Sequence, residues 1–235
     1  MKFYLSFGGG VNSVAMMLMF LDQKEEFEAI FVDHETDWPE TYEYFEMFQG
    51  WLKEHGHQPI ITIKATSLYD YALSKSMVPA TYPRWCTRQF KLSPIMKYYK
   101  KPCFNMLGIA SDESKRAKLS VEKGVENRFP LIEADIDRDG CKQIILGHGL
   151  PLPMKSGCYI CPFQRRNQWV ELRTKHPDLF CKAQQLEKKN MEYRESKGKV
   201  PLTLSPTKKP LNVLVNEDQM KLFEEMEYPP CHCGL

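Results

Sequence analysis

Hydrophobic and polar residues alternate in blocks along the first half of the chain. Four short apolar runs have the length of buried strands, at residues 2–7, 27–33, 59–64 and 103–109. Two longer segments have helical character, at residues 13–24 and 39–56. Because these strands and helices alternate, the pattern predicts an α/β fold in which helices flank a mostly parallel sheet.

The second half of the chain has a different pattern of predicted elements. Residues 137–148 indicate a helix, and the Pro/Gly-rich stretch 150–161 predicts a loop. Residues 167–197 are typical of a long polar helix that breaks near Pro177, followed by a linker at 198–210. This half is therefore expected to be irregular and helical.

This change in the pattern of predicted elements indicates how the chain divides into domains. We expect an α/β domain at residues 1–155 and a C-terminal region at 156–235 that packs on it. The charged run at residues 187–199 predicts a helix face in contact with solvent.

A glycine-rich loop joins the first predicted strand to the first helix. Residues 6–13 read SFGGGVNS and lie where an open parallel sheet binds its ligand, beyond the carboxyl ends of its strands. Successive glycines let backbone N–H groups approach an anion, and the following helix adds partial positive charge. No lysine follows the glycines, which excludes the common nucleoside-triphosphate loop. The loop is a candidate phosphate cradle, with a tight structural turn as the alternative.

This loop resembles the PP-loop of the ATP pyrophosphatases and phosphoadenosine-phosphosulfate (PAPS) reductases, usually written Ser-Gly-Gly-x-Asp-Ser. Gly9, Gly10 and Ser13 match that motif. Gly8 replaces its serine and Asn12 its aspartate. The aspartate is associated with ATP-cleaving members, so Asn12 leaves open whether ATP is cleaved. The resemblance implies nucleotide binding by Ser6, Gly8, Gly9, Gly10, Asn12 and Ser13.

Further segments follow in the family's order. Asp33 ends the second predicted strand, and residues 39–42 (PETY) resemble the family's Pro-Glu-Thr helix start. Residues 108–116 (GIASDESKR) resemble its Gly-Ile-x-x-x-Glu-Ser-x-Arg segment. The resemblance implies an adenine nucleotide α-hydrolase-like fold of the HUP type. It also implies Asp33 near the adenine or ribose, and Arg116 as a catalytic residue on phosphate or sulfate.

Two cysteine segments predict a metal centre. Residues 158–161 (CYIC) form a short loop in which both thiolates can face one metal. Residues 85–94 (WCTRQFKLSP) resemble the Cys-Cys-x-x-Arg-Lys-x-x-Pro pattern of adenylylsulfate (APS) reductases, with Thr87 in place of the second cysteine. They also resemble a Cys-Thr-x-x-x-Lys segment of sulfur-inserting proteins, including those of DNA phosphorothioation systems. The resemblance implies a four-iron four-sulfur (4Fe-4S) cluster on Cys86, Cys158 and Cys161, with Lys91 at the nucleotide.

The fourth ligand of this centre stays open. Either one iron accepts exogenous sulfide or substrate, or Cys231 or Cys233 of the terminal CHCGL closes the site. Zinc held by the same three cysteines, with His232 or a terminal cysteine, is the alternative. Cys233 also lies in a Cys-Gly-Leu ending that resembles the reductases' nucleophile, which makes it a second candidate catalytic residue. The other cysteines are expected to be structural: Cys103, Cys141 and Cys181.

Composition limits the partners and the location. The 32 basic and 30 acidic residues nearly cancel, so only a local patch could bind nucleic acid. Residues 164–169 (QRRNQW) have the composition of such a contact and equally of a helix start. The apolar run 14–21 is shorter than the roughly 20 residues that span a bilayer, so no membrane association is expected. The absence of a signal peptide predicts the cytoplasm, where the eight cysteines are not expected to form structural disulfides. A homodimer remains open.

These features together predict adenine-nucleotide-dependent sulfur transfer of the ATP pyrophosphatase or thiolation type. It would use a 4Fe-4S cluster, ATP with Mg²⁺, and a sulfur donor. A PAPS or APS reductase, with a thiol reductant and Cys233 as nucleophile, is the first alternative. A zinc-stabilised nucleotide or nucleic-acid binding module without catalysis is the second, and Asn12 is its best support.

Overall fold

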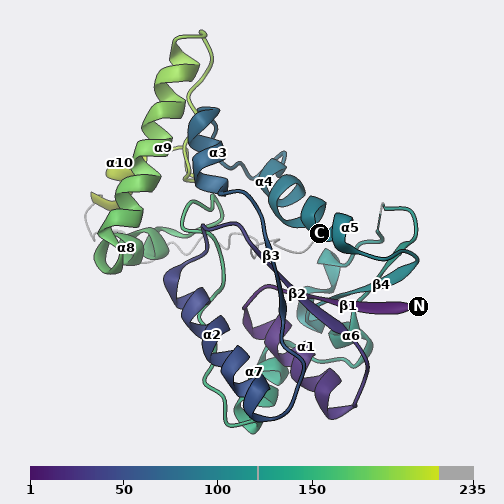
Figure 1. Ribbon diagram of the computed structural model, residues 1–235. Helices are drawn as coiled ribbons and strands as arrows, with labels where there is room; N and C mark the ends of the chain where they lie inside the picture. The colour runs from purple at the N-terminus through teal and green to yellow at the C-terminus, as the bar shows by residue number, and fades with distance from the viewer. Residues whose placement is uncertain (121, 217–235) are drawn as a thin grey trace.

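The computed structural model describes residues 1–120 and 122–216, and a parallel sheet forms its centre (Figure 1). Within these residues the strand order is β3-β2-β1-β4-β5, and every neighbouring pair is parallel. The strands are β1 (Lys2–Phe7), β2 (Glu28–Asp33), β3 (Ile61–Lys64), β4 (Cys103–Leu107) and β5 (Val125–Arg128). The α/β fold predicted from the sequence is confirmed. Since the strand order reverses between β1 and β4, a ligand crevice is expected at their carboxyl ends.

One face of the sheet is covered by α1 (Val11–Asp22), α2 (Pro39–Glu54) and α7 (Arg138–Gly147), which lie together in Figure 1. Leu5 and Phe31 point to this face and join its apolar core. Because side chains alternate along a strand, their neighbours Tyr4 and Ile30 point to the opposite face. Two-sided burial explains why the strands read as nearly continuous apolar runs.

The opposite face is covered by α5 (Ser93–Tyr98), which follows α4 (Trp85–Thr87) and the π-helical turn η1 (Arg88–Leu92). Ile95 and Tyr99 pack there against Tyr4, and the two tyrosine rings stack with centroids 4.4 Å apart. The segment that carries Cys86 and Lys91 is thereby fixed beside the sheet. Two further short elements, η2 (Ser111–Arg116) and α6 (Pro130–Glu133), lie before and after β5.

A second group of helices extends away from the sheet in Figure 1. It comprises α3 (Leu68–Ser74), α8 (Arg166–Lys175), α9 (Pro177–Glu195) and α10 (Leu211–Asn216). Its apolar core combines Trp169 and Leu186 with Trp38 and Phe90 from the first half of the chain. The region after residue 155 therefore shares a core with earlier segments. None of the described helices is both long enough and apolar enough to cross a membrane.

Local expectations can be compared with the structure in three segments. The helix predicted at 13–24 begins at Val11 and has no polar side-chain cap, because Gly10 occupies the cap position. The predicted long helix divides into α8 and α9 at Pro177, as expected. The run 187–199 is not uniformly solvated. Glu187 is 4% exposed and accepts hydrogen bonds from the N–H groups of Leu204 (2.9 Å) and Leu211 (2.8 Å).

Candidate functional site

A cavity of about 620 Å³ lies at the carboxyl ends of β1, β2 and β4. This volume is in the range of small-molecule and cofactor sites. The strands contribute Ser6, Val32 and Leu107 to its wall. Several residues singled out in the sequence also line it: Gly8, Gly10, Asn12, Ser13, Lys91 and Arg116. We call it the nucleotide cavity.

Glycines shape the loop at one end of this cavity. Gly9 has a φ of +67°, which favours glycine, and a Cβ there would lie 3.0 Å from Thr41 Cγ2. Gly9 therefore forms the turn without lining the cavity, whereas Gly8 lines it and has open space around its Cα. At Gly108 a Cβ would meet the Ser13 backbone nitrogen at 3.0 Å, so β4 and the loop approach closely only with glycine.

Positive charge gathers at the same cavity. Five cationic side chains line it: Lys91, Arg116, Arg138, Lys155 and Arg165. Two acidic ones, Asp37 and Glu113, oppose them. Phosphate or sulfate groups of a nucleotide would suit this excess of cations.

Asn12 stands between two of these charged groups. Its Nδ2 donates to Glu113 Oε2 at 3.1 Å, and its Oδ1 accepts from Arg138 Nη1 at 3.4 Å. Glu113 Oε2 also pairs with Arg116 Nη1 at 2.7 Å. The buried Nε of Arg116 has no hydrogen-bond partner among the residues that the structure describes. This guanidinium is therefore held in place and keeps donor capacity for a ligand.

A buried polar chain supports the cavity wall. Asn105 Oδ1 accepts from Ser6 Oγ at 2.9 Å and from Tyr99 Oη at 2.7 Å. Asn105 Nδ2 donates to Asn127 Oδ1 at 2.9 Å. Burial raises the pKa of Tyr99, which keeps its hydroxyl protonated as a donor. Sequence reasoning missed Asn105, although an amide inside an apolar strand was a usable signal.

The three predicted cysteine ligands line a second, smaller pocket. Cys86 comes from α4, and Cys158 and Cys161 from the loop before α8. Apolar walls surround these half-buried thiols, and Thr87 and Lys91 line both this pocket and the nucleotide cavity. We call it the thiol pocket. Its donor set fits an iron-sulfur cluster or zinc, since thiolates bind both. The other proposed ligands, Cys231, His232 and Cys233, lie outside the described residues.

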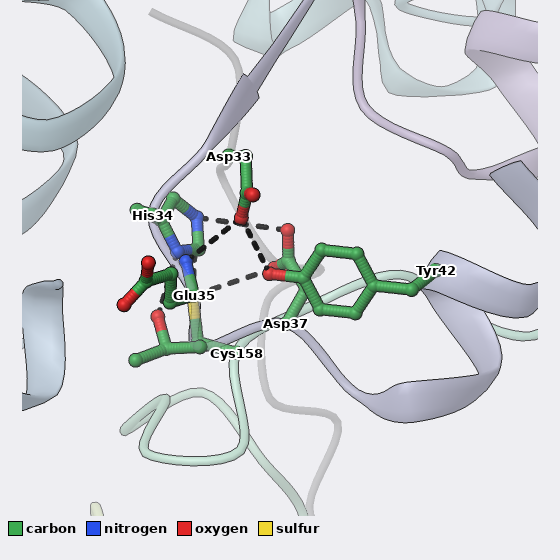
Figure 2. A network of polar contacts seen from close by, with 7 residues as sticks. Asp33, His34, Glu35, Asp37, Tyr42 and Cys158 are labelled. Atoms are coloured by element: carbon green, nitrogen blue, oxygen red, sulfur yellow. Dashed lines mark hydrogen bonds and ion pairs between the residues drawn. The ribbon is translucent and has the colours of Figure 1, made fainter. Parts of the chain in front are cut away.

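A buried polar network borders the thiol pocket, at the end of β2 (Figure 2). His34 Nε2 lies 3.6 Å from Asp37 Oδ2 and 3.8 Å from Cys158 Sγ. Burial lowers the pKa of His34, although the nearby carboxylate of Asp37 acts in the opposite direction. The lowered pKa favours the neutral imidazole. Sequence reasoning missed His34 and Asp37, because residues 34–37 (HETD) match no motif.

Asp33, which the resemblance implies near the adenine or ribose, lies at the end of β2. Its Oδ1 accepts hydrogen bonds from Tyr42 Oη and from the Glu35 backbone N–H, both at 2.9 Å. Asp33 does not line the nucleotide cavity. Its described contacts fix the turn that carries His34.

Other predicted residues also have defined places. Trp169 is fully buried in the helical core, so its ring cannot stack on a base, and that part of the nucleic-acid hypothesis is wrong. Arg165 caps α8 and lines the nucleotide cavity. Cys103 and Cys141 are buried, as expected, and burial raises the pKa of the Cys141 thiol to about 12. Cys181 is exposed on α9.

Comparisons with known proteins find one curated relative and two solved structures that are similar to this chain. An uncharacterised protein of Methanocaldococcus jannaschii is 26% identical over 192 residues, which cover 75% of this chain and 45% of the relative. The chain thus spans less than half the length of that relative. A PAPS reductase from Candida auris, solved as a phosphate complex, is 16% identical, with a TM-score of 0.49 over 65% of this chain and 75% of its own. The U34-tRNA thiolase NcsA from Methanococcus maripaludis, solved with its [4Fe-4S] cluster, is 16% identical, with a TM-score of 0.47 over 81% of this chain and 72% of its own.

The family itself is shown by a match to a family model. Residues 2–134 match the family model of the phosphoadenosine phosphosulfate reductase domain. This range contains the glycine loop, the cationic residue Arg116 and the first cysteine, Cys86. Because the match spans more than half of the chain, this protein belongs to the phosphoadenosine phosphosulfate reductase domain family.

Proposed function

We propose that this chain is an adenine-nucleotide-dependent sulfur-transfer enzyme of the ATP pyrophosphatase or thiolation type. One observation carries the proposal: the nucleotide cavity and the thiol pocket share Thr87 and Lys91 in their walls. A substrate activated by the nucleotide would therefore lie beside three sulfur ligands. This adjacency is what the transfer of sulfur to an activated substrate requires.

The phosphate end of the site has a clear division of roles. The backbone N–H group of Gly10, with the N-terminus of α1, would hold the phosphates, while the Gly8 N–H donates to Ser13 Oγ at 3.2 Å. Arg116 and Arg138 would offset the charge that develops there. Glu113 is already paired with Arg116 and Asn12, so we expect the phosphates to supply most ligands of an accompanying Mg²⁺.

The thiol pocket would hold the metal centre. Cys86, Cys158 and Cys161 would bind a 4Fe-4S cluster, which supplies an iron for sulfide when one position stays open. Apolar residues around the thiols, including Leu68 and Phe163, limit access of water to them. Lys91 would stabilise negative charge at the boundary of the two sites, as a cation in both walls.

Anaerobic turnover tests the proposal. The purified chain receives ATP, Mg²⁺, radiolabelled sulfide and a desalted cell extract that supplies acceptors. We expect AMP and pyrophosphate, and label transferred to an acceptor. The Cys158→Ser variant should lose label transfer, whereas Cys181→Ser, with an exposed thiol on α9, should keep it. Equal label transfer by wild type and Cys158→Ser would contradict the proposal.

Reduction of PAPS or APS is a second candidate, favoured by Asn12. A neutral amide there removes the carboxylate associated with ATP-cleaving relatives, and it still binds Glu113 and Arg138. Cys233 would be the nucleophile, and a thiol would supply electrons. Release of sulfite from PAPS or APS without ATP cleavage would select this activity. Stoichiometric zinc with neither reaction would instead select a binding module.

A further inference from the structure

His34, Asp37 and Cys158 form a ligand set that differs from the three cysteines. Each offers one ligand atom, and these atoms all lie within 4.8 Å of one another. Among the described residues, this group does not include Cys86 or Cys161. Figure 2 shows the imidazole of His34, the carboxylate of Asp37 and the thiol of Cys158 lying close together.

The distances between these atoms match a single tetrahedral ion. Metal–ligand bonds of about 2.0–2.3 Å place neighbouring ligand atoms about 3.3–3.8 Å apart in a tetrahedral zinc site. The observed separations are 3.6 Å for His34 Nε2 to Asp37 Oδ2, 3.8 Å for His34 Nε2 to Cys158 Sγ, and 3.7 Å for Asp37 Oδ1 to Cys158 Sγ. Taken with one oxygen of Asp37, the three ligand atoms lie within 4.8 Å of one another, so the carboxylate must turn that oxygen toward both partners to close the site around an ion.

The backbone positions these side chains before any ion binds. Asp37 and Cys158 form an isolated antiparallel bridge, although 121 residues separate them in the sequence. The N–H of Tyr159 donates to the Thr36 carbonyl at 2.8 Å. Thr36 Oγ1 also bonds His34 Nδ1 at 2.7 Å, which leaves Nε2 directed at the other two ligands. Such a partner on the distal ring nitrogen is typical of histidines that bind metal.

The charge balance also favours a cation. Asp37 is 6% exposed and His34 is fully buried. Asp37 forms an ion pair with His34, a partner that carries a charge only when it is protonated. A buried carboxylate without a cationic partner is costly, and a divalent ion would offset that cost.

We propose that His34 Nε2, a carboxylate oxygen of Asp37 and Cys158 Sγ bind one divalent ion of the Zn²⁺ class. A mixed nitrogen, oxygen and sulfur set with three protein ligands leaves one position for water or substrate. Asp37 also lines the nucleotide cavity, so the ion would lie at the wall of that cavity. The ion would occupy this site in protein that carries no cluster, so it is tested separately from the proposed sulfur transfer. Because Cys158 also lines the thiol pocket, this ion and a cluster bound through Cys158 exclude each other.

Cobalt titration of the full chain tests this site. The protein is freed of metal and titrated anaerobically with Co²⁺, whose visible bands report tetrahedral geometry and whose near-ultraviolet band reports a thiolate ligand. We expect one equivalent with both signatures, displaced by Zn²⁺. His34→Ala, Asp37→Asn and Cys158→Ser should each weaken Co²⁺ binding more than tenfold. Cys86→Ser and Cys161→Ser are the matched controls and should change the affinity less than twofold.

A gain-of-signal variant covers the risk that His34→Ala unfolds this buried position. His34→Cys should retain one equivalent of Co²⁺ and intensify the thiolate band, because two thiolates then bind the ion. The proposal is overturned if Cys86→Ser or Cys161→Ser weakens binding as much as Cys158→Ser. It is also overturned if His34→Cys leaves the thiolate band unchanged.

Discussion

The side-chain amide of Asn12 donates a hydrogen bond to the carboxylate of Glu113, with 3.1 Å between Nδ2 and Oε2. The two residues are 101 positions apart in the sequence and both line the nucleotide cavity. An aspartate at position 12, as in the PP-loop motif, would instead face Glu113 with a like charge. The neutral amide is therefore matched to its neighbour.

This pairing predicts the effect of restoring the aspartate. Asn12→Asp should weaken binding of Mg²⁺-free ATP more than tenfold, because two adjacent carboxylates repel each other and the phosphates. Added Mg²⁺ should recover part of the loss. The double variant Asn12→Asp/Glu113→Gln should bind more tightly than Asn12→Asp alone, since an amide again faces a carboxylate. Calorimetry measures all three affinities. Equal ATP affinities of Asn12→Asp and wild type would show that the Asn12–Glu113 pair does not influence nucleotide binding.

The close approach at Gly108 predicts a steric effect on both stability and binding. In Gly108→Ala the new Cβ meets backbone atoms of Asn12 and Ser13 at 3.0–3.1 Å. The glycine loop must then shift, which should cost about 1–3 kcal/mol of unfolding free energy and more than tenfold in nucleotide affinity. Gly147→Ala is the control, because a Cβ at this helical position has nothing within 4 Å. Denaturant unfolding and calorimetry provide the measurements. A Gly108→Ala protein that behaves like Gly147→Ala would refute the close approach.

The thiol pocket predicts which cysteines hold iron. Cys86→Ser and Cys161→Ser should each remove most of the iron from anaerobically purified protein, because each deletes a ligand of the proposed cluster. Cys141→Ser should retain it, since this thiol is buried in α7 away from the pocket. Metal analysis with an absorption spectrum decides the matter. The cluster hypothesis is wrong if Cys86→Ser and Cys161→Ser keep their full iron content. It is also wrong if the wild type contains zinc alone.

Glu187 predicts a pH dependence of stability. Burial raises the pKa of this carboxyl above its ordinary 4.5, although its two backbone hydrogen bonds act in the opposite direction. The protonated form is therefore favoured in the folded state. The resulting stability is fully present below pH 4.5 and is lost as pH rises through the raised folded-state pKa.

Two substitutions isolate this effect. Glu187→Gln cannot titrate, so the stability of wild type relative to this variant should fall as pH rises from about 4.5 through the folded-state pKa. The variant should also lose about 1–3 kcal/mol, because its NH₂ group faces one of the two backbone N–H donors. Glu192→Gln, at an exposed position on α9, should show neither change. Urea unfolding across this pH range measures both. A constant difference between wild type and Glu187→Gln would exclude the raised pKa.

The sequence predicted most of the fold because burial on both sides of a parallel sheet leaves apolar runs that are easy to recognise. β5 was missed because its sequence, VENR, offers a single buried apolar residue. The glycine loop and the cysteines were found through a resemblance to known motifs. The positions of His34 and Asp37 beside Cys158 were not predictable, because they depend on a backbone bridge between residues 121 positions apart. Likewise, no local pattern showed that Trp169 and Glu187 would be buried.

We propose that a nucleotide binds beside the metal centre, because Thr87 and Lys91 line both sites. The most direct measurement is the electron paramagnetic resonance spectrum of the reduced, cluster-loaded chain as ATP or PAPS is added. We predict that the spectrum shifts with the same midpoint as nucleotide binding by calorimetry. Lys91→Ala should reduce this shift, because the cation lies between the sites. A spectrum that stays unchanged at saturating nucleotide would show that the nucleotide does not bind beside the cluster.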